Sequence, residues 1–156
     1  VNTLALVDTP SLAGTTETLE LATFYVGDLL VGADIRQVEE INRQMDFTPL
    51  PHVPPFVLGV LNLRGNVVTV VDLRTILGVK PDSQSRRSHN VIIRFEGERI
   101  GLAVDRIADV VRTTIDAIDE LPANFDAMDT RFLQGVYAME NELLLVLNVQ
   151  EALSLQ

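Results

Sequence analysis

Few residues in this chain have the side-chain chemistry and spacing that catalysis or metal binding requires. Cysteine is absent, and the two histidines, His52 and His89, stand far apart without the spacing of metal ligands. Two Asp-Thr pairs occur, but Pro10 and Arg131 follow them in place of the glycine of an aspartic protease. The sequence also lacks a glycine-rich phosphate-binding motif. We therefore predict no catalytic residue, no metal site and no cofactor.

The overall composition is that of a folded, acidic protein. Hydrophobic residues make up 47% of the chain, which is enough for a substantial core. The formal net charge of −10 would be repelled by phosphate backbones, so we predict no nucleic-acid partner. Because the sequence has neither an apolar run of about 18 residues nor a signal peptide, we predict a cytoplasmic protein without direct membrane insertion. Residues 1–18 are expected to be a flexible N-terminal segment.

The elements that must carry any function repeat along the chain. The segment GADIRQVEEI (32–41) aligns without gaps with GLAVDRIADV (101–110), and 59–77 aligns in the same way with 135–153. The aligned apolar positions include Val38 with Ile107, Ile41 with Val110, and Val67 with Leu143. Two matching blocks in the same order indicate an internal duplication.

Each half of the duplication has the pattern of short β-strands followed by a short helix. Turn residues between apolar runs predict four hairpins, with turns at Gly27-Asp28, Gly65-Asn66, Glu96-Gly97 and Glu140-Asn141. Asp72 and Asn148 each follow a strand, and we expect their side chains to cap the helices that begin there.

Each half is too small to form a β-sandwich but could close into a small barrel, which would remove exposed strand edges. Two such barrels would be marginally stable alone, so we expect them to pack together and share a third apolar seam. The polar segment 79–90, which includes His89, is the expected crossing between halves of roughly 19–88 and 89–156.

Four segments together resemble the signature of the CheW-like domain family. They are VEEI (38–41), GVLNLRGNVVTVVDLRTILG (59–78), GLAVDRIADVV (101–111) and FLQGVYAMENELLLVLNVQEAL (132–153). The resemblance covers about residues 19–155. It implies an all-β fold with few short helices, in which two five-stranded SH3-like β-barrels are related by a pseudo-twofold axis.

The resemblance also implies a function without catalysis. Members of this family act as cytoplasmic adaptors that couple the tips of chemoreceptors to the regulatory domain of the histidine kinase CheA. They are recruited to membrane-associated receptor arrays and contact other CheW-like domains in rings. A free-standing adaptor is favoured, while a domain of a CheA or CheV protein, or an adaptor of a CheA-type pathway that does not control motility, remains an alternative.

Residues near the first hairpin turn are the sharpest candidates for protein binding. By resemblance, Arg64 pairs with Glu40 and fixes the hairpin against the segment 38–41. The neighbouring Asn62 belongs to the same signature. Val38 and Ile41 fit two readings equally well, as core residues of a strand or as the lining of a receptor-contacting groove.

Two aromatic residues complete the predicted binding set. Phe56 follows a proline-rich stretch that would present it rigidly for binding, although a plug at the end of a barrel is the favoured reading. By resemblance, Phe125 falls on a second surface, which contacts ring partners. The arginine that the family often carries before the matching proline is replaced here by the sequence Asp119-Glu120-Leu121. Because the two halves repeat, the resemblance implies two CheA-facing surfaces, one on each half.

Overall fold

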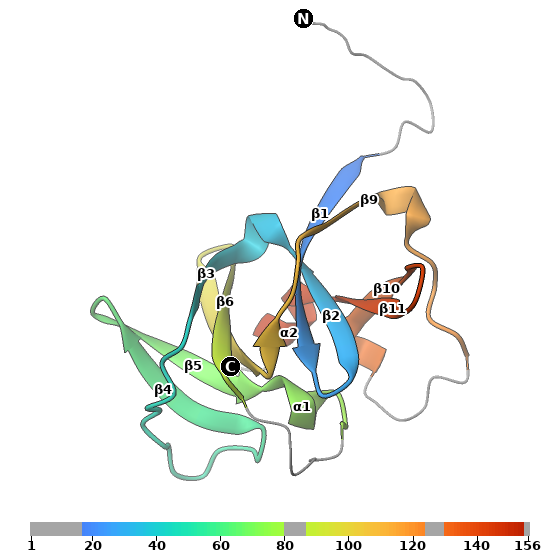
Figure 1. The fold of residues 1–156 in the computed structure, drawn as a ribbon. Helices are drawn as coiled ribbons and strands as arrows, with labels where there is room; N and C mark the ends of the chain where they lie inside the picture. The colour runs from blue at the N-terminus through green and yellow to red at the C-terminus, as the bar shows by residue number, and fades with distance from the viewer. Residues whose placement is uncertain (1–16, 80–86, 124–129, 155–156) are drawn as a thin grey trace, which may run out of the picture.

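The computed structural model describes residues 17–79, 87–123 and 130–154, and these residues form two β-sheets with two short helices (Figure 1). The first sheet has the strand order β10-β11-β2-β1-β8, and β9 also pairs with β1. Its strands are β1 (Thr18–Val26), β2 (Leu29–Asp34), β8 (Arg106–Ile107), β9 (Val111–Thr114), β10 (Leu133–Ala138) and β11 (Leu143–Leu147).

The second sheet has the strand order β3-β6-β7-β5-β4. Its strands are β3 (Val38–Asn42), β4 (Val57–Leu63), β5 (Asn66–Asp72), β6 (His89–Phe95) and β7 (Glu98–Val104). The predicted all-β class with few helices is confirmed. Among the described strands, no continuous ladder joins the two ends of either sheet, so the architecture is two sheets and not fully closed barrels.

The predicted duplication is present in the strand pairing. Each sheet contains one parallel pair at its centre, β5 with β7 and β11 with β2, at repeat-related positions. Each sheet also has one isolated bridge, Thr48 with Val60 and Asp119 with Val136. Gly59 and Gly135 lie beside these bridges, where a Cβ atom would collide with the carbonyl oxygen of Thr48 or Asp119. The two sheets are therefore related by a pseudo-twofold arrangement.

The two sequence halves do not form one sheet each. The first sheet combines the β1–β2 hairpin with the β10–β11 hairpin, and the second combines β4–β5 with β6–β7. This exchange follows from the parallel pairing, because each parallel pair joins hairpins that lie far apart in the sequence. His89, which we predicted in the crossing segment, instead begins β6; residues 80–86 of the crossing lie outside the described residues.

The turn of the β4–β5 hairpin differs from its prediction by one residue. The turn residues are Arg64 and Gly65, with φ angles of 50° and 87°, whereas Asn66 is already paired with Leu63. Two consecutive left-handed residues give a turn whose twist matches the strands. The Glu96–Gly97 turn has the same conformation, with φ angles of 52° and 83°, and lies where it was predicted.

Both short helices begin at the predicted capping residues. The Oδ1 atom of Asp72 accepts a hydrogen bond from the Arg74 amide at 3.1 Å, at the start of α1 (Leu73–Ile76). Asn148 accepts from the Glu151 amide at 3.2 Å, at the start of α2 (Val149–Leu153). These side chains satisfy amide groups that have no partner within the helix.

Three apolar clusters make up the core, as the doubled architecture predicts. One cluster lies within the second sheet and includes Leu61 and Val70, and another lies within the first sheet and includes Leu21 and Val146. The largest cluster joins side chains of both sheets and both helices. This third cluster is the predicted seam, and it holds the two sheets together as one unit.

Candidate functional site

An apolar groove lies where the chain crosses between the two sheets. It has a volume of about 340 Å³ and is lined by Ala22, Thr23, Ile35, Val38, Glu40, Ile41, Ile107, Ala108 and Val110. The crossing segments are η1 (Ile35–Gln37) with β3 on one side, and β8 with the residues that follow it on the other. The Ala108 amide donates to the Thr23 carbonyl oxygen at 2.9 Å, which fixes the second crossing against β1.

The groove follows the internal repeat. Its lining contains Val38 with its repeat partner Ile107, and Ile41 with its repeat partner Val110. Equivalent side chains of the two halves therefore face a common space. The pseudo-twofold that relates the two sheets therefore also relates the two sides of the groove.

The apolar lining of the groove is unusually accessible. Ile41 is 40% exposed and Val110 is 51% exposed. Val38, in contrast, is half-buried and packs against the shared core. The sequence allows Val38 and Ile41 to be either core residues of a strand or the lining of a groove. Val38 fits both readings, whereas Ile41 fits the groove lining. Accessible apolar side chains gathered in a hollow are typical of a binding surface.

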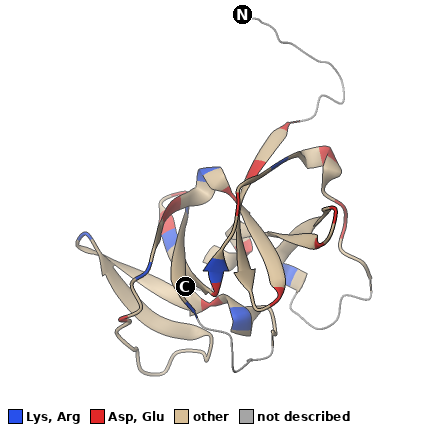
Figure 2. Ribbon diagram, in the orientation of Figure 1, with Lys and Arg blue, Asp and Glu red and all other residues tan. Residues whose placement is uncertain are grey.

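The predicted ion pair involves Glu40 in the middle of β3. The Nη1 atom of Arg64 donates a hydrogen bond to Oε1 of Glu40 at 2.6 Å. A bulge in β3 between Val38 and Glu40 shifts the register against β6 and thereby orients Glu40. Arg64 itself occupies a left-handed turn position of the β4–β5 hairpin. The tip of this hairpin has the colour of Lys and Arg in Figure 2. The pair thus ties the hairpin tip to the strand that lines the groove.

The other predicted binding residues do not line the groove. The Oδ1 atom of Asn62 accepts a hydrogen bond from the Gly65 amide at 2.9 Å, and so it stabilises the hairpin turn. Phe56 is half-buried and packs against the shared core, and its carbonyl oxygen accepts from the Asp72 amide at 2.7 Å. Phe125 lies outside the described residues.

Several apolar residues of the groove and of the surface were not selected from the sequence. Ile35, Ile107 and Val110 line the groove. Ile107 and Val110 could have been found from the sequence, because the repeat aligns them with Val38 and Ile41. Val67 and Leu143, near the starts of β5 and β11, are 71% and 51% exposed and are also repeat partners. They give each sheet one exposed apolar residue at an equivalent place.

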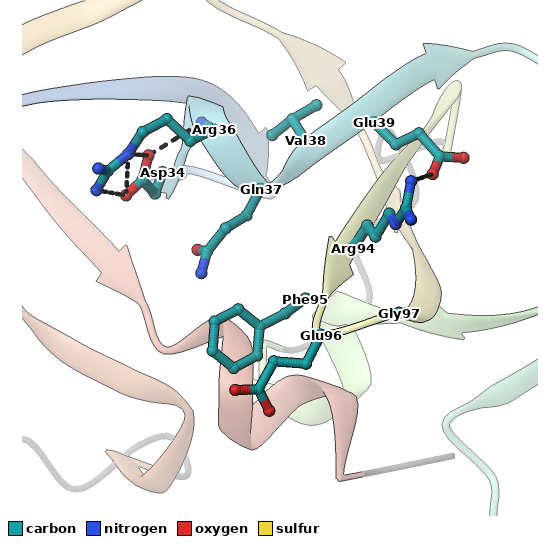
Figure 3. A pocket seen from close by; sticks show the side chains of 9 residues that line it. All are labelled: Asp34, Arg36, Gln37, Val38, Glu39, Arg94, Phe95, Glu96 and Gly97. Carbon is teal, nitrogen blue, oxygen red and sulfur yellow. Dashed lines mark hydrogen bonds and ion pairs between the residues drawn. The ribbon is translucent and has the colours of Figure 1, made fainter.

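A second, polar hollow of about 730 Å³ lies on the other side of η1 and β3 (Figure 3). The side chain of Arg36 is held by its neighbour Asp34, with Nη2 at 2.7 Å from Oδ2, while Gln37 points toward Phe95. The Arg36 guanidinium also lowers the pKa of the Asp34 carboxyl. Charges of both signs line this hollow, so it favours no single kind of ligand.

Hydrogen bonds hold the ring of His89 in place. The Nε2 atom of His89 accepts a hydrogen bond from Arg43 Nε at 3.2 Å, and Nδ1 lies 2.7 Å from Ser88 Oγ. Burial and the Arg43 charge lower the pKa of His89. Within residues 17–79, 87–123 and 130–154, no cluster of three or more His, Asp or Glu side chains could hold a metal ion. In the same residues no helix is long and apolar enough to cross a membrane.

Comparison with known proteins decides the family. The model of the CheW-like domain matches residues 20–156. The chain belongs to the CheW-like domain family. Among the curated CheW relatives, a probable chemotaxis protein CheW of Rhizobium etli is 30% identical over 135 residues, which cover 86% of this chain and 87% of the relative.

Another CheW relative and a solved CheW structure extend the similarity. A chemotaxis protein CheW of Klebsiella aerogenes is 30% identical over 149 residues, which cover 96% of this chain and 90% of the relative. The crystal structure of the scaffolding protein TtCheW from Thermoanaerobacter tengcongensis superimposes with a TM-score of 0.77 and 25% identity. The match covers 90% of this chain and 91% of that one.

Proposed function

We propose that this protein is a non-enzymatic chemotaxis adaptor that couples the cytoplasmic tips of chemoreceptors to the regulatory domain of the histidine kinase CheA. The observation that carries the proposal is the accessible apolar groove between β3 and β8, built from repeat-related side chains of both halves. The names of the CheW relatives, which include a scaffolding protein, support the same conclusion.

The groove suits a receptor tip because its apolar side chains are exposed to water, and their burial would favour binding. Ile35, Ile41 and Val110 keep between a third and a half of their surface in water. Burying the exposed part of each of these side chains would contribute about 1 kcal/mol per residue to binding. The Arg64–Glu40 pair is proposed to hold the hairpin at the rim in the binding geometry.

The kinase is proposed to bind elsewhere, at the exposed faces that carry Val67 and Leu143. These two residues are repeat partners and stand on different sheets, so the protein offers two equivalent faces. Two faces of this kind suit the regulatory domain of CheA on one side and another CheW-like domain in a ring on the other. We propose Phe125 as a further contact of the second face. Such contacts would recruit the protein from the cytoplasm to receptor arrays.

Reconstitution tests this function directly. The protein is mixed with a soluble receptor-tip fragment and CheA, and complex formation and CheA autophosphorylation are measured. We expect ternary complexes and increased autophosphorylation only when all three components are present. The Ile41→Asp variant, which places a charge in the groove, should lose receptor binding by at least about 10-fold. Kinase activity that is indifferent to the protein would refute the proposal.

A further inference from the structure

A compact arginine-lined hollow of about 290 Å³ lies at the end of the second sheet. Its lining is Glu39, Leu63, Arg64, Asn66, Val68, Arg94 and Arg99. The three arginines come from the two hairpins, β4–β5 and β6–β7, and Glu39 comes from β3. Glu96 and Glu98, in and beside the β6–β7 turn, are not part of the lining.

The nearby carboxylates engage only some of the N–H donors of the arginines in this hollow. Glu39 Oε1 accepts from Arg99 Nε at 2.8 Å. The same oxygen lies 3.8 Å from Arg94 Nη1, a pair that Figure 3 shows. Arg64 is bound by Glu40, which lies outside the lining. Three guanidinium groups thus face two carboxylates, in a protein whose net charge is −10. Each guanidinium carries five N–H donors, and these contacts engage one nitrogen of each.

The fold does not require this concentration of arginine. The residues of the first sheet that correspond to Arg94 and Arg99 are Tyr25 and Leu30, which face each other across β1 and β2 just as the arginines do across β6 and β7. Arg64 corresponds to Glu140. The equivalent end of the first sheet is therefore aromatic, aliphatic and acidic. One arginine, Arg106, stacks on the Tyr25 ring there, whereas three arginines line the hollow of the second sheet.

We propose that the arginine hollow binds a carboxylate side chain of the partner that fills the apolar groove. The two sites meet at the Arg64–Glu40 ion pair, because Arg64 lines the hollow and Glu40 lines the groove. A guanidinium fork binds a carboxylate through two parallel hydrogen bonds. An acidic residue beside the apolar stripe of the partner would therefore fix its register along β3. This inference rests on the proposed function, since it uses the same partner.

Arg94 is the residue to change, because it is 56% exposed and makes the weakest contact with Glu39. In the full chain, Arg94→Glu should lower the affinity for a receptor-tip fragment about 10-fold and reduce its dependence on salt. Arg94→Gln should have a smaller effect. Arg112→Glu is the matched control: Arg112 is 78% exposed and pairs with Glu20 in the first sheet. It should change the affinity less than about twofold.

A rescue experiment keeps the result independent of folding. Single Asp or Glu residues of the receptor tip are changed to Lys, and one of these changes should restore binding to Arg94→Glu. Unchanged affinity of Arg94→Glu, or equal losses in Arg94→Glu and Arg112→Glu, would overturn the inference. If Ile41→Asp alone weakens binding, the groove stands and the hollow fails. If Arg94→Glu alone weakens binding, the hollow stands and the groove is refuted.

Discussion

Charge reversal of the Glu40–Arg64 pair tests how the hairpin tip is held against β3. The variants are Glu40→Arg, Arg64→Glu and the double reversal. The Nη1–Oε1 distance of 2.6 Å is that of a direct charge-assisted hydrogen bond, but the Arg64 side chain is 77% exposed. Water and salt therefore screen most of the attraction. The pair should orient the hairpin more than it stabilises the protein.

The magnitude follows from this exposure. An exposed ion pair contributes about 0.2–1 kcal/mol to the free energy of unfolding. Each single reversal removes that attraction and adds a repulsion of similar size, so each should destabilise the protein by at most about 2 kcal/mol. The double reversal restores opposite charges at the same places and should recover about half of the loss or more.

Urea unfolding of the four proteins gives the coupling free energy of the pair as a double-mutant cycle. We expect a coupling of about 0.6–3 kcal/mol at low salt, roughly three times the pair energy, because both single reversals replace an attraction by a repulsion and the double reversal restores an attraction. The coupling should decrease in 1 M NaCl. A coupling of zero, with the double reversal no more stable than the worse single variant, would refute the pairing. A coupling that salt does not change would mean that packing, and not charge, links the two residues.

Further predictions concern the repeat and the histidine. Gly59→Ala and Gly135→Ala should each lower the free energy of unfolding by about 2–4 kcal/mol, because the new Cβ meets a bridging carbonyl oxygen. At Gly65 an added Cβ would meet open space, but the φ of 87° strains any other residue, so Gly65→Ala should cost only about 1–2 kcal/mol. Equal losses at all three glycines would contradict this reasoning. The lowered pKa of His89 means that the unfolded chain binds its proton first, so the free energy of unfolding should fall as the pH drops below about 6.5. His89→Gln should flatten this decline in urea titrations between pH 7 and 5, and an unchanged decline would show that other groups cause it.

The repeat was the most productive signal in the sequence. It predicted the equivalent hairpins, the shared apolar seam and both capping residues, because these features depend on local patterns that are copied in each half. It did not predict that each sheet combines hairpins from both halves. That exchange depends on the parallel pairs β5–β7 and β11–β2, which join distant segments and leave no local signature. The one-residue error at the β4–β5 turn arose because Arg64 takes the left-handed conformation that glycine and asparagine normally supply.

The candidate site was predictable only in part. The Glu40–Arg64 pair came from family resemblance, and the structure shows it as a direct contact. Alternation along β3 could not distinguish a core residue from a groove residue, since a bulge at this strand changes which side chains face inward. Val67 and Leu143 were aligned with each other in the repeat, yet their exposure depends on the ends of the sheets and could not be known from the sequence.

A crossed binding measurement tests the central claim most directly. The affinities of Ile41→Asp and Val67→Asp are measured for the receptor-tip fragment and for the regulatory domain of CheA. Both changes place a carboxylate on an exposed apolar residue, so they are matched in chemistry and differ in location. We predict that Ile41→Asp loses the receptor and keeps the kinase domain, whereas Val67→Asp keeps the receptor and loses the kinase domain. Full receptor affinity in Ile41→Asp would contradict the assignment of the groove as the receptor site.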